Sequence, residues 1–368
     1  MATVYIHIGA PKTATSTLQS IFSKKYKKLL KNGVLYPRAG RHGDAHHLLV
    51  CDLIEKYQDH RMADFWYGDC ERGGAWQALR EDIDSHGDNI HSVIVSSELF
   101  FGQTKNIDQM QDEIKASLAG HEIKIVVYLR RQDQLYSSFF NQDVKGVRQW
   151  AHSAYQFYDT HQIFEHDYHG MLKIWSEPFG KDNVLIRPYE SEQWAGNDIV
   201  LDFCESLDII RLKSGRVSRN KALGVNQLYF KQCLNRVGFE KALNDDVVDL
   251  LIRTLPEEPS KDCLYIRKRL YRQLRKGWLA VNRKLEQDFL AGQTLFRKDI
   301  PLPGALNVYS TDKQAVTASL TLIINKVRSG GFGAHNQLFA KAALLVLAEQ
   351  DLWDILSKES RLSLMALV

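Results

Sequence analysis

The stretch TVYIHIGAPKTATST, residues 3–17, decides the fold of the N-terminal region, because a strand pattern and a helix pattern meet there around a loop. The run TVYIHI is apolar and rich in β-branched residues, which is typical of a buried parallel strand. The small and hydroxyl residues of GAPKTATST follow, and then apolar residues such as Leu18 and Phe22 recur at helical spacing. Asn32 and Gly33 supply a helix end. The stretch therefore predicts a strand, a tight loop and an amphipathic helix.

Three further apolar runs, residues 92–97, 123–129 and 183–189, have the character of central parallel strands. Helical patterns separate these runs. Because parallel strands need crossover connections, the alternation predicts an α/β fold with a doubly wound sheet. From Glu190 onward the pattern is mostly helical.

A break in the pattern near residue 300 indicates a domain boundary. Pro301, Pro303 and Gly304 interrupt the helical region there, and a last apolar helical segment follows a second glycine-rich break. We therefore expect one domain over residues 1–300 and a helical C-terminal extension over residues 301–368.

Composition and charge limit the class of protein. The chain has 368 residues and a net charge of +4, which is compatible with anionic ligands but does not require nucleic acid. The five cysteines form no CxxC pair, so we expect neither a disulfide framework nor a zinc site, and a reducing, cytoplasmic location fits best. No apolar run approaches the ~20 residues that span a bilayer, so no membrane span is predicted.

The loop after the first strand has the residues of an anion site. A loop that leads into a helix gathers backbone N–H groups and the positive end of the helix dipole, and Lys12 adds a cation. Hydroxyl donors surround the lysine at Thr13, Thr15, Ser16 and Thr17. The nucleotide-kinase pattern GxxxxGK[ST], whose hydroxyl holds Mg²⁺, is absent, which disfavours an ATP-dependent enzyme. A turn that is merely rich in hydroxyls is the alternative interpretation.

The segment PKTATST resembles the 5′-phosphosulfate loop of sulfotransferases, and KNGVLYP, residues 31–37, resembles the bacterial carbohydrate-type members of that family. The resemblance implies a sulfotransferase fold of the P-loop type and the donor 3′-phosphoadenosine 5′-phosphosulfate (PAPS), with no metal required. It also implies that Lys12 contacts the oxygen between phosphate and sulfate. The 5′-phosphosulfate would be held by Thr13, Ala14, Thr15, Ser16 and Thr17.

A second family motif for the 3′-phosphate is a strand that ends in arginine, with a serine eight residues later. The segment VVYLRRQDQLYSS, residues 126–138, provides Arg130 and Ser138 at this spacing. Arginine offers a planar fork of donors to phosphate, and serine at a helix start offers a hydroxyl. Arg131 and Ser137 are the competing pair, and surface charge is the alternative for both arginines.

Sulfuryl transfer also needs a base that removes the proton of the acceptor. Glu98 follows the strand predicted over residues 92–97, and with the aromatic residues after it resembles the base of polysaccharide sulfotransferases. A helix-start glutamate beside a serine cap is the alternative. The segment HGDAHHLL, residues 42–49, offers His46 and His47 as rival bases or acceptor contacts, although a polar loop with surface histidines is the favoured interpretation.

Three weaker patterns remain. Arg187 in VLIRPYE, and the segment SRNKALG over residues 218–224, are each expected to form either a structural ion pair or a ligand contact. The basic residues between 265 and 285 accompany an apolar stripe, so a solvated helix face is favoured over nucleic-acid binding.

The residue patterns by themselves predict an anion-binding loop on an α/β sheet. The resemblance implies a PAPS-dependent enzyme that sulfates a hydroxyl or amine of a carbohydrate or related acceptor and releases adenosine 3′,5′-bisphosphate. An ATP-dependent phosphotransferase and a non-catalytic nucleotide-binding protein are the alternatives.

Overall fold

The computed structural model describes residues 1–153, 156–157, 167–215, 222–256, 263–264, 268–302, 307–308 and 313–368. The chain forms two compact units. The first comprises Met1–Gln132, Phe164–Ser218 and Lys276–Ile300, and the second comprises Asp133–Ile163, Arg219–Arg275 and Pro301–Val368.

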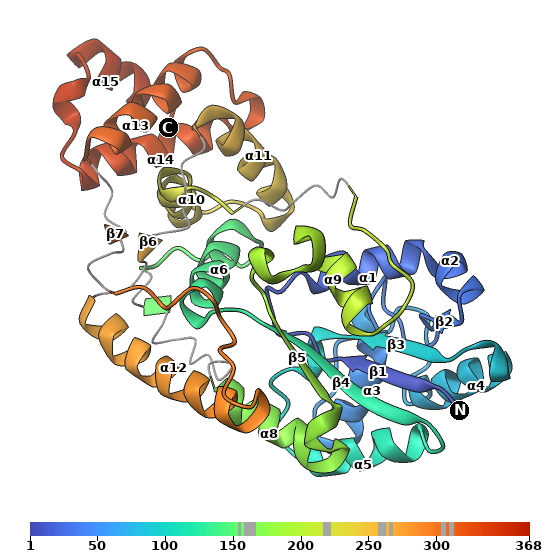
Figure 1. The fold of residues 1–368 in the computed structure, drawn as a ribbon. Coiled ribbons are helices and arrows are strands. Elements are labelled where there is room, and N and C mark those ends of the chain that lie inside the picture. The colour runs from blue at the N-terminus through green and yellow to red at the C-terminus, as the bar shows by residue number, and fades with distance from the viewer. Residues whose placement is uncertain are drawn as a thin grey trace. The chain divides into compact units, whose positions relative to one another are not determined.

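The first unit is built on a five-stranded, all-parallel sheet with the order β2-β3-β1-β4-β5 (Figure 1). The strands are β1 (Thr3–His7), β2 (Val34–Leu35), β3 (Ser92–Ser96), β4 (Glu122–Leu129) and β5 (Val184–Pro188). The α/β class and all four predicted strands are confirmed. The sequence pattern missed β2, because two residues are too short a run for a strand signal.

Helices alternate with the strands along the first unit. They are α1 (Thr15–Lys24), α2 (Tyr26–Lys31), α3 (His47–Tyr57), α4 (Ala75–His86), α5 (Ile107–Ser117), α8 (Tyr168–Phe179) and α9 (Ile199–Ser206). The predicted first helix is divided at Lys25 into α1 and α2. Leu18 and Phe22 of α1 and Phe203 of α9 are fully buried in one core cluster with sheet residues such as Val126. The amphipathic face of α1 is thus anchored on the sheet.

The second unit is helical. It contains most of α6 (Gln132–Lys145), together with α10 (Val225–Val237), α11 (Asn244–Thr254), α13 (Lys313–Arg328), α14 (Asn336–Glu349) and α15 (Lys358–Met365). Two short strands, β6 (Cys263–Leu264) and β7 (Asn307–Val308), pair in parallel. The helical region is therefore larger than residues 301–368, since residues 219–275 belong to it.

The helix α12 (Lys268–Phe289) carries the basic segment noted in the sequence. Tyr271, Trp278 and Leu285 are buried along it, while Arg272, Lys276 and most of the other charged side chains are exposed. This is the apolar stripe with a solvated face that the pattern predicts. Part of the segment, residues 265–267, lies outside the described residues. In the described ranges, no helix is both long and apolar enough to cross a membrane.

The sheet topology places two loops next to each other. The connection after β1 leads toward β2 on one side, while the connection after β4 leads toward β5 on the other. The carboxyl ends of β1 and β4 therefore form a topological switch point, where α/β proteins usually bind their ligands. The predicted Lys12 loop follows β1, and Arg130 follows β4.

Candidate functional site at the carboxyl edge of the sheet

The loop between β1 and α1 has an unusual backbone. Gly9, Lys12 and Ala14 all have positive φ angles, of 48°, 65° and 62°. The left-handed conformation is strained for lysine and alanine. Where left-handed and right-handed residues alternate in a loop, successive backbone N–H groups can turn to the same side, as in anion-binding nests. A Cβ at Gly9 would lie 2.6 Å from Thr15 Cγ2 and 3.5 Å from Glu98 Cα. Glycine is thus needed at this positive φ, where the loop after β1 packs tightly against Thr15.

The helix α1 begins directly from this loop. Its N-cap is Ala14, whose carbonyl accepts from the N–H groups of Thr17 and Leu18. The methyl side chain of Ala14 cannot cap the N–H groups of Thr15 and Ser16, which by geometry have no partner within the helix. An anion at this position would take the place of a side-chain cap.

The predicted hydroxyl donors are not equally accessible. Thr13 is fully buried, and its hydroxyl donates to the carbonyl of Ala10 at 2.5 Å. Thr15 is also buried, Thr17 is half-buried and Ser16 is exposed. Thr13 therefore shapes the loop, and its hydroxyl proton is already used.

The two arginines after β4 have different environments. Arg130 Nη1 donates to the carbonyl oxygen of Lys12 at 3.1 Å, and its guanidinium lies 5.4 Å from the ring centre of Tyr189. Arg131 is buried and donates to the carbonyl of Asp299 at 3.0 Å. Of the two, Arg130 is the one that the structure joins to the Lys12 loop.

The serines expected beside these arginines lie within α6. Ser138 is six residues beyond Gln132, the first residue of α6, and not at the helix start that the sequence interpretation assumed. An amide this far into a helix is used by the helix itself, so Ser138 offers only its hydroxyl. The competing Ser137 donates to the carbonyl of Asp133 at 3.0 Å. Both serines belong to the second unit, whereas Arg130 belongs to the first.

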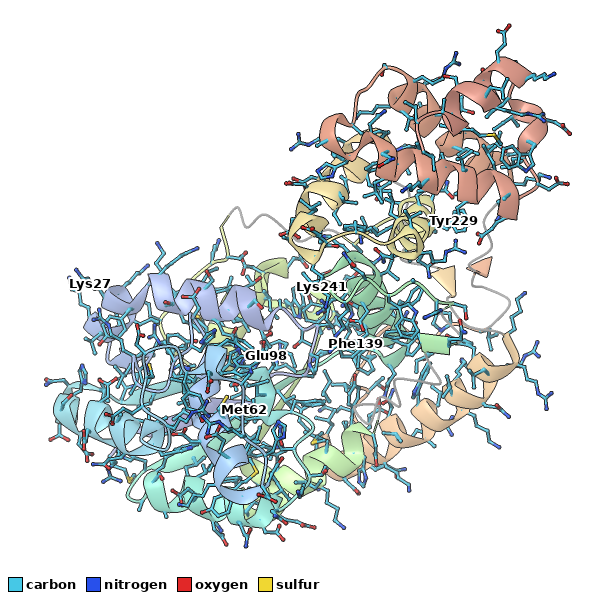
Figure 2. All side chains as sticks on the ribbon, turned by 180° about the vertical axis from the view of Figure 1, so that it is seen from behind. Lys27, Met62, Glu98, Phe139, Tyr229 and Lys241 are labelled. Carbon is cyan, nitrogen blue, oxygen red and sulfur yellow. The ribbon has the colours of Figure 1, made fainter. Side chains whose placement is uncertain are left out.

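Glu98 is the first residue of a short 3-10 turn that directly follows β3 (Figure 2). The Ser97 hydroxyl accepts from the Leu99 N–H at 3.3 Å, so the predicted serine cap exists. The Glu98 side chain is 30% exposed, and its Oε2 accepts a hydrogen bond from Gln19 Nε2 at 2.9 Å. The carboxylate is held in place while it stays open to solvent.

The neighbouring histidines divide into one structural and one site residue. His46 is fully buried, and burial together with the nearby Arg41 charge lowers its pKa to about 3. Its Nδ1 accepts from the Ser96 N–H at 3.1 Å, so the other ring nitrogen carries the proton and donates to the Pro37 carbonyl at 3.0 Å. Both nitrogens are occupied, so His46 is not suited to act as a base.

His47 lies beside Glu98, with Nε2 3.9 Å from Glu98 Oε1 and Nδ1 2.8 Å from the Ser97 hydroxyl. Burial lowers the His47 pKa, and the Glu98 charge opposes that shift without reversing it. The structure thus brings both base candidates, Glu98 and His47, to one point.

Two site residues were missed by the sequence interpretation. Gln19 Nε2 bridges Glu98 and the Ser96 hydroxyl, and Ser96 in turn lies 2.9 Å from Nδ1 of His7. His7 is fully buried at the end of β1, which lowers its pKa to about 3. A signal for Gln19 existed, because it is a polar residue on the buried face of α1 with Leu18 and Phe22.

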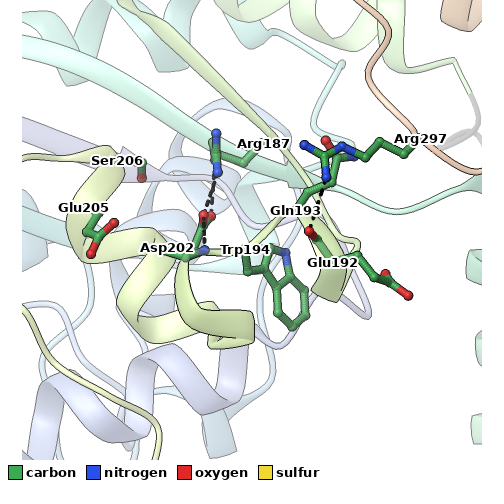
Figure 3. A pocket seen from close by; sticks show the side chains of 9 residues that line it. Arg187, Glu192, Gln193, Trp194, Asp202, Glu205, Ser206 and Arg297 are labelled. Carbon is green, nitrogen blue, oxygen red and sulfur yellow. Dashed lines mark hydrogen bonds and ion pairs between the residues drawn. The ribbon is translucent and has the colours of Figure 1, made fainter.

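A separate hollow of about 390 Å³ lies near β5 and α9 (Figure 3). Arg187 lines it and forms a two-point ion pair with the buried Asp202, with Nε–Oδ2 and Nη2–Oδ1 distances of 3.2 and 2.5 Å. Of the two interpretations of Arg187, the structural ion pair is therefore the one observed. The segment 218–224 lies only partly in the described ranges, so its role stays a prediction.

Fold and site together define an α/β protein with a loop of three left-handed residues at the switch point of a parallel sheet. No family model matches the chain, and no solved structure matches it. A curated relative from Archaeoglobus fulgidus, described as an uncharacterized protein, is 32% identical over 117 residues. The match covers 32% of this chain and 30% of the relative, so the chain spans less than a third of that protein's length.

Proposed function

We propose that this chain is a sulfotransferase that transfers the sulfuryl group of PAPS to a hydroxyl or amine of a carbohydrate or related acceptor. The observation that carries the proposal is the hydrogen bond from Arg130 Nη1 to the Lys12 carbonyl, which joins two motifs 118 residues apart. Both motifs were assigned to the same donor from the sequence. Their meeting at the switch point supports a single donor site.

The proposed reaction is an in-line displacement. The acceptor oxygen or nitrogen attacks sulfur, the bond between sulfur and the bridging oxygen breaks, and adenosine 3′,5′-bisphosphate leaves. Lys12 neutralises the charge that develops on the bridging oxygen, and Glu98 accepts the acceptor's proton. Glu98 is preferred over His47 as the base because its side chain is 30% exposed, compared with 11% for His47.

Thermal melting with adenosine 3′,5′-bisphosphate, without Mg²⁺, tests the donor site. A ligand at one hundred times its Kd stabilises the folded state by about 2.7 kcal/mol, so the wild-type Tm should rise measurably. Lys12→Ala and Arg130→Ala should lose most of this rise, because each removes a positive charge from the loop region. Lys27→Ala, which changes an exposed lysine of α2, is the matched control and should keep it (Figure 2).

Two outcomes would contradict the proposal. If millimolar bisphosphate leaves the wild-type Tm unchanged, the donor site is wrong. If ATP with Mg²⁺ stabilises the protein and the bisphosphate does not, an ATP-dependent phosphotransferase is the better assignment.

A further inference from the structure

An exposed aromatic surface lies close to the candidate base. Among the Phe, Tyr and Trp side chains of the described residues, Phe65 is the one in the exposed class, with 63% of its surface accessible. Its ring lies 4.6 Å from that of Trp66 at 35°, and the His42 ring contacts both. We call Phe65, Trp66 and His42 the aromatic platform.

The platform is connected to Glu98 through a single residue. The ring centres of Trp66 and His47 are 5.2 Å apart, and His47 Nε2 lies 3.9 Å from Glu98 Oε1. All of these residues belong to the first unit. A molecule resting on the platform would therefore lie within a few side-chain lengths of the group that removes the acceptor's proton.

The segment that carries the platform is fixed to α3. Met62 N–H donates to Glu55 Oε1 at 2.8 Å, and Arg72 bridges Glu55 and Asp64. Just after the platform, Tyr67 OH donates to the buried carboxylate of Asp52 at 2.9 Å. The chain on either side of Phe65 and Trp66 is thus anchored. Leaving the ring in water forfeits part of the stabilisation that its burial would contribute, and a ligand that covers it would recover this.

Two exposed charged residues lie close to Phe65 in the chain. The Asp64 side chain is 85% exposed and that of Arg61 is 77% exposed, and the two are 3.4 Å apart. An apolar face edged by hydrogen-bonding groups matches a sugar ring, which has an apolar C–H face and a rim of hydroxyls. Two rings are too small an area for a protein partner, since a stable interface buries about 800 Å² per partner.

We propose that the aromatic platform is the acceptor subsite and that it stacks one ring of a saccharide acceptor against Phe65 and Trp66. The assignment rests on the proposed function, because Glu98 is placed as the base of that reaction. It adds the residues that select the acceptor and hold its hydroxyl near Glu98.

An array of immobilised oligosaccharides, both neutral and uronic-acid-containing and four to six sugars long, tests the platform. Wild-type protein should bind a subset of them. Phe65→Ala and Phe65→Leu should weaken binding at least tenfold, whereas Phe65→Tyr should retain it, because the ring is what the sugar contacts. Leu362→Ala, at another exposed apolar residue, is the control and should bind like wild type. Absence of saccharide binding by the wild type, or equal binding by Phe65→Ala, overturns the proposal.

Melting with adenosine 3′,5′-bisphosphate on the same variants separates this assignment from the donor site. Phe65→Ala should show the wild-type rise in Tm, because Phe65 lies outside the Lys12 loop. A normal rise without saccharide binding overturns the platform alone. Saccharide binding that depends on Phe65, without any rise in the wild type, overturns the sulfotransferase proposal and leaves the platform as a carbohydrate site.

Discussion

At the scale of single residues, Glu98 is held by neighbours that also leave it accessible. Gln19 donates to one carboxylate oxygen at 2.9 Å, and His47 lies 3.9 Å from the other. A base must be fixed within hydrogen-bond reach of the proton that it removes, and it must be open to the acceptor. Glu98 meets both conditions, whereas His46 is neutral and has both ring nitrogens occupied.

Glu98→Gln should keep donor binding and lose transfer. The amide has nearly the shape of the carboxylate but cannot accept a proton, and general-base catalysis contributes typically about 10²–10⁴-fold. Transfer of labelled sulfate from PAPS to a saccharide bound on the array measures the loss, with bisphosphate melting as the folding control. If Glu98→Gln turns over at the wild-type rate, Glu98 is not the base, and His47 is the better assignment.

Gln19→Leu provides a graded comparison with Glu98→Gln. Losing the hydrogen bond that orients the carboxylate should lower kcat by less than Glu98→Gln does and should alter the pH dependence of kcat. Gln77→Leu is the matched control, because Gln77 also donates to a glutamate at 2.9 Å but is exposed on α4. Equal rates for Gln19→Leu and wild type would show that the orienting bond is unnecessary.

One physical reason explains why the sequence analysis missed the two site residues Gln19 and His7. Gln19 and His7 act through contacts with Ser96, which is 77 and 89 residues away, and no local pattern encodes such a distance. Lys12 and Arg130 were found because the segments that contain them follow recognisable strands and resemble the two donor motifs of sulfotransferases. The sequence therefore indicates which side chains end strands, but not which of them meet.

At the scale of elements, the long apolar strands were predictable, whereas β2 and the start of α6 were not. A strand of two residues has no period, and helix starts carry weak signals unless a cap is present. Because α6 begins at Gln132, Ser138 lies inside the helix and not at its start, where the sequence analysis had placed it. The segment between α3 and α4 was also unassigned, although it carries Phe65.

Asp52→Ala should destabilise the segment that joins α3 to α4. The buried Asp52 carboxylate accepts from Tyr67 OH, Gly73 N–H and Ala75 N–H, each at 2.9 Å. Removing it leaves these donors without their partner, which should lower the free energy of unfolding by about 3 kcal/mol. Urea denaturation checks this value, and Asp88→Ala, at an exposed aspartate, should change it by less than about 0.5 kcal/mol. A loss as small as that of the control would show that water replaces the carboxylate.

At the scale of the whole molecule, the apolar runs predicted the central sheet of the first unit, because central parallel strands are long and apolar. The second unit is assembled from three separate segments of the chain, among them residues 219–275 and 301–368. Helical periodicity identifies each of its helices but not which helices pack together. Val316 of α13 and Phe339 of α14 share one core cluster with Phe230 of α10, which is about 90 residues earlier than Val316.

Two buried histidines should make the fold sensitive to acid. His7 and His46 have folded-state pKa values of about 3, depressed by burial, compared with about 6.5 in an unfolded chain. Between these values the unfolded chain binds more protons, so stability is full above pH 6.5 and falls as the pH drops toward 3. Each histidine contributes up to about 1.4 kcal/mol per pH unit, or roughly 5 kcal/mol for both between pH 6 and pH 4.

The slope of the unfolding free energy against pH, from urea denaturation followed by circular dichroism between pH 6 and pH 4.5, measures this effect. His46→Gln should be less stable than wild type at pH 7 because its hydrogen bonds are lost, yet its slope should be shallower by about one proton. His60→Gln, at an exposed histidine, should keep the wild-type slope. The loss of hydrogen bonds lowers the stability at pH 7, whereas the loss of the titrating ring lowers the slope, so the two effects can be told apart. An unchanged slope in His46→Gln would show that His46 takes up its proton without unfolding the protein.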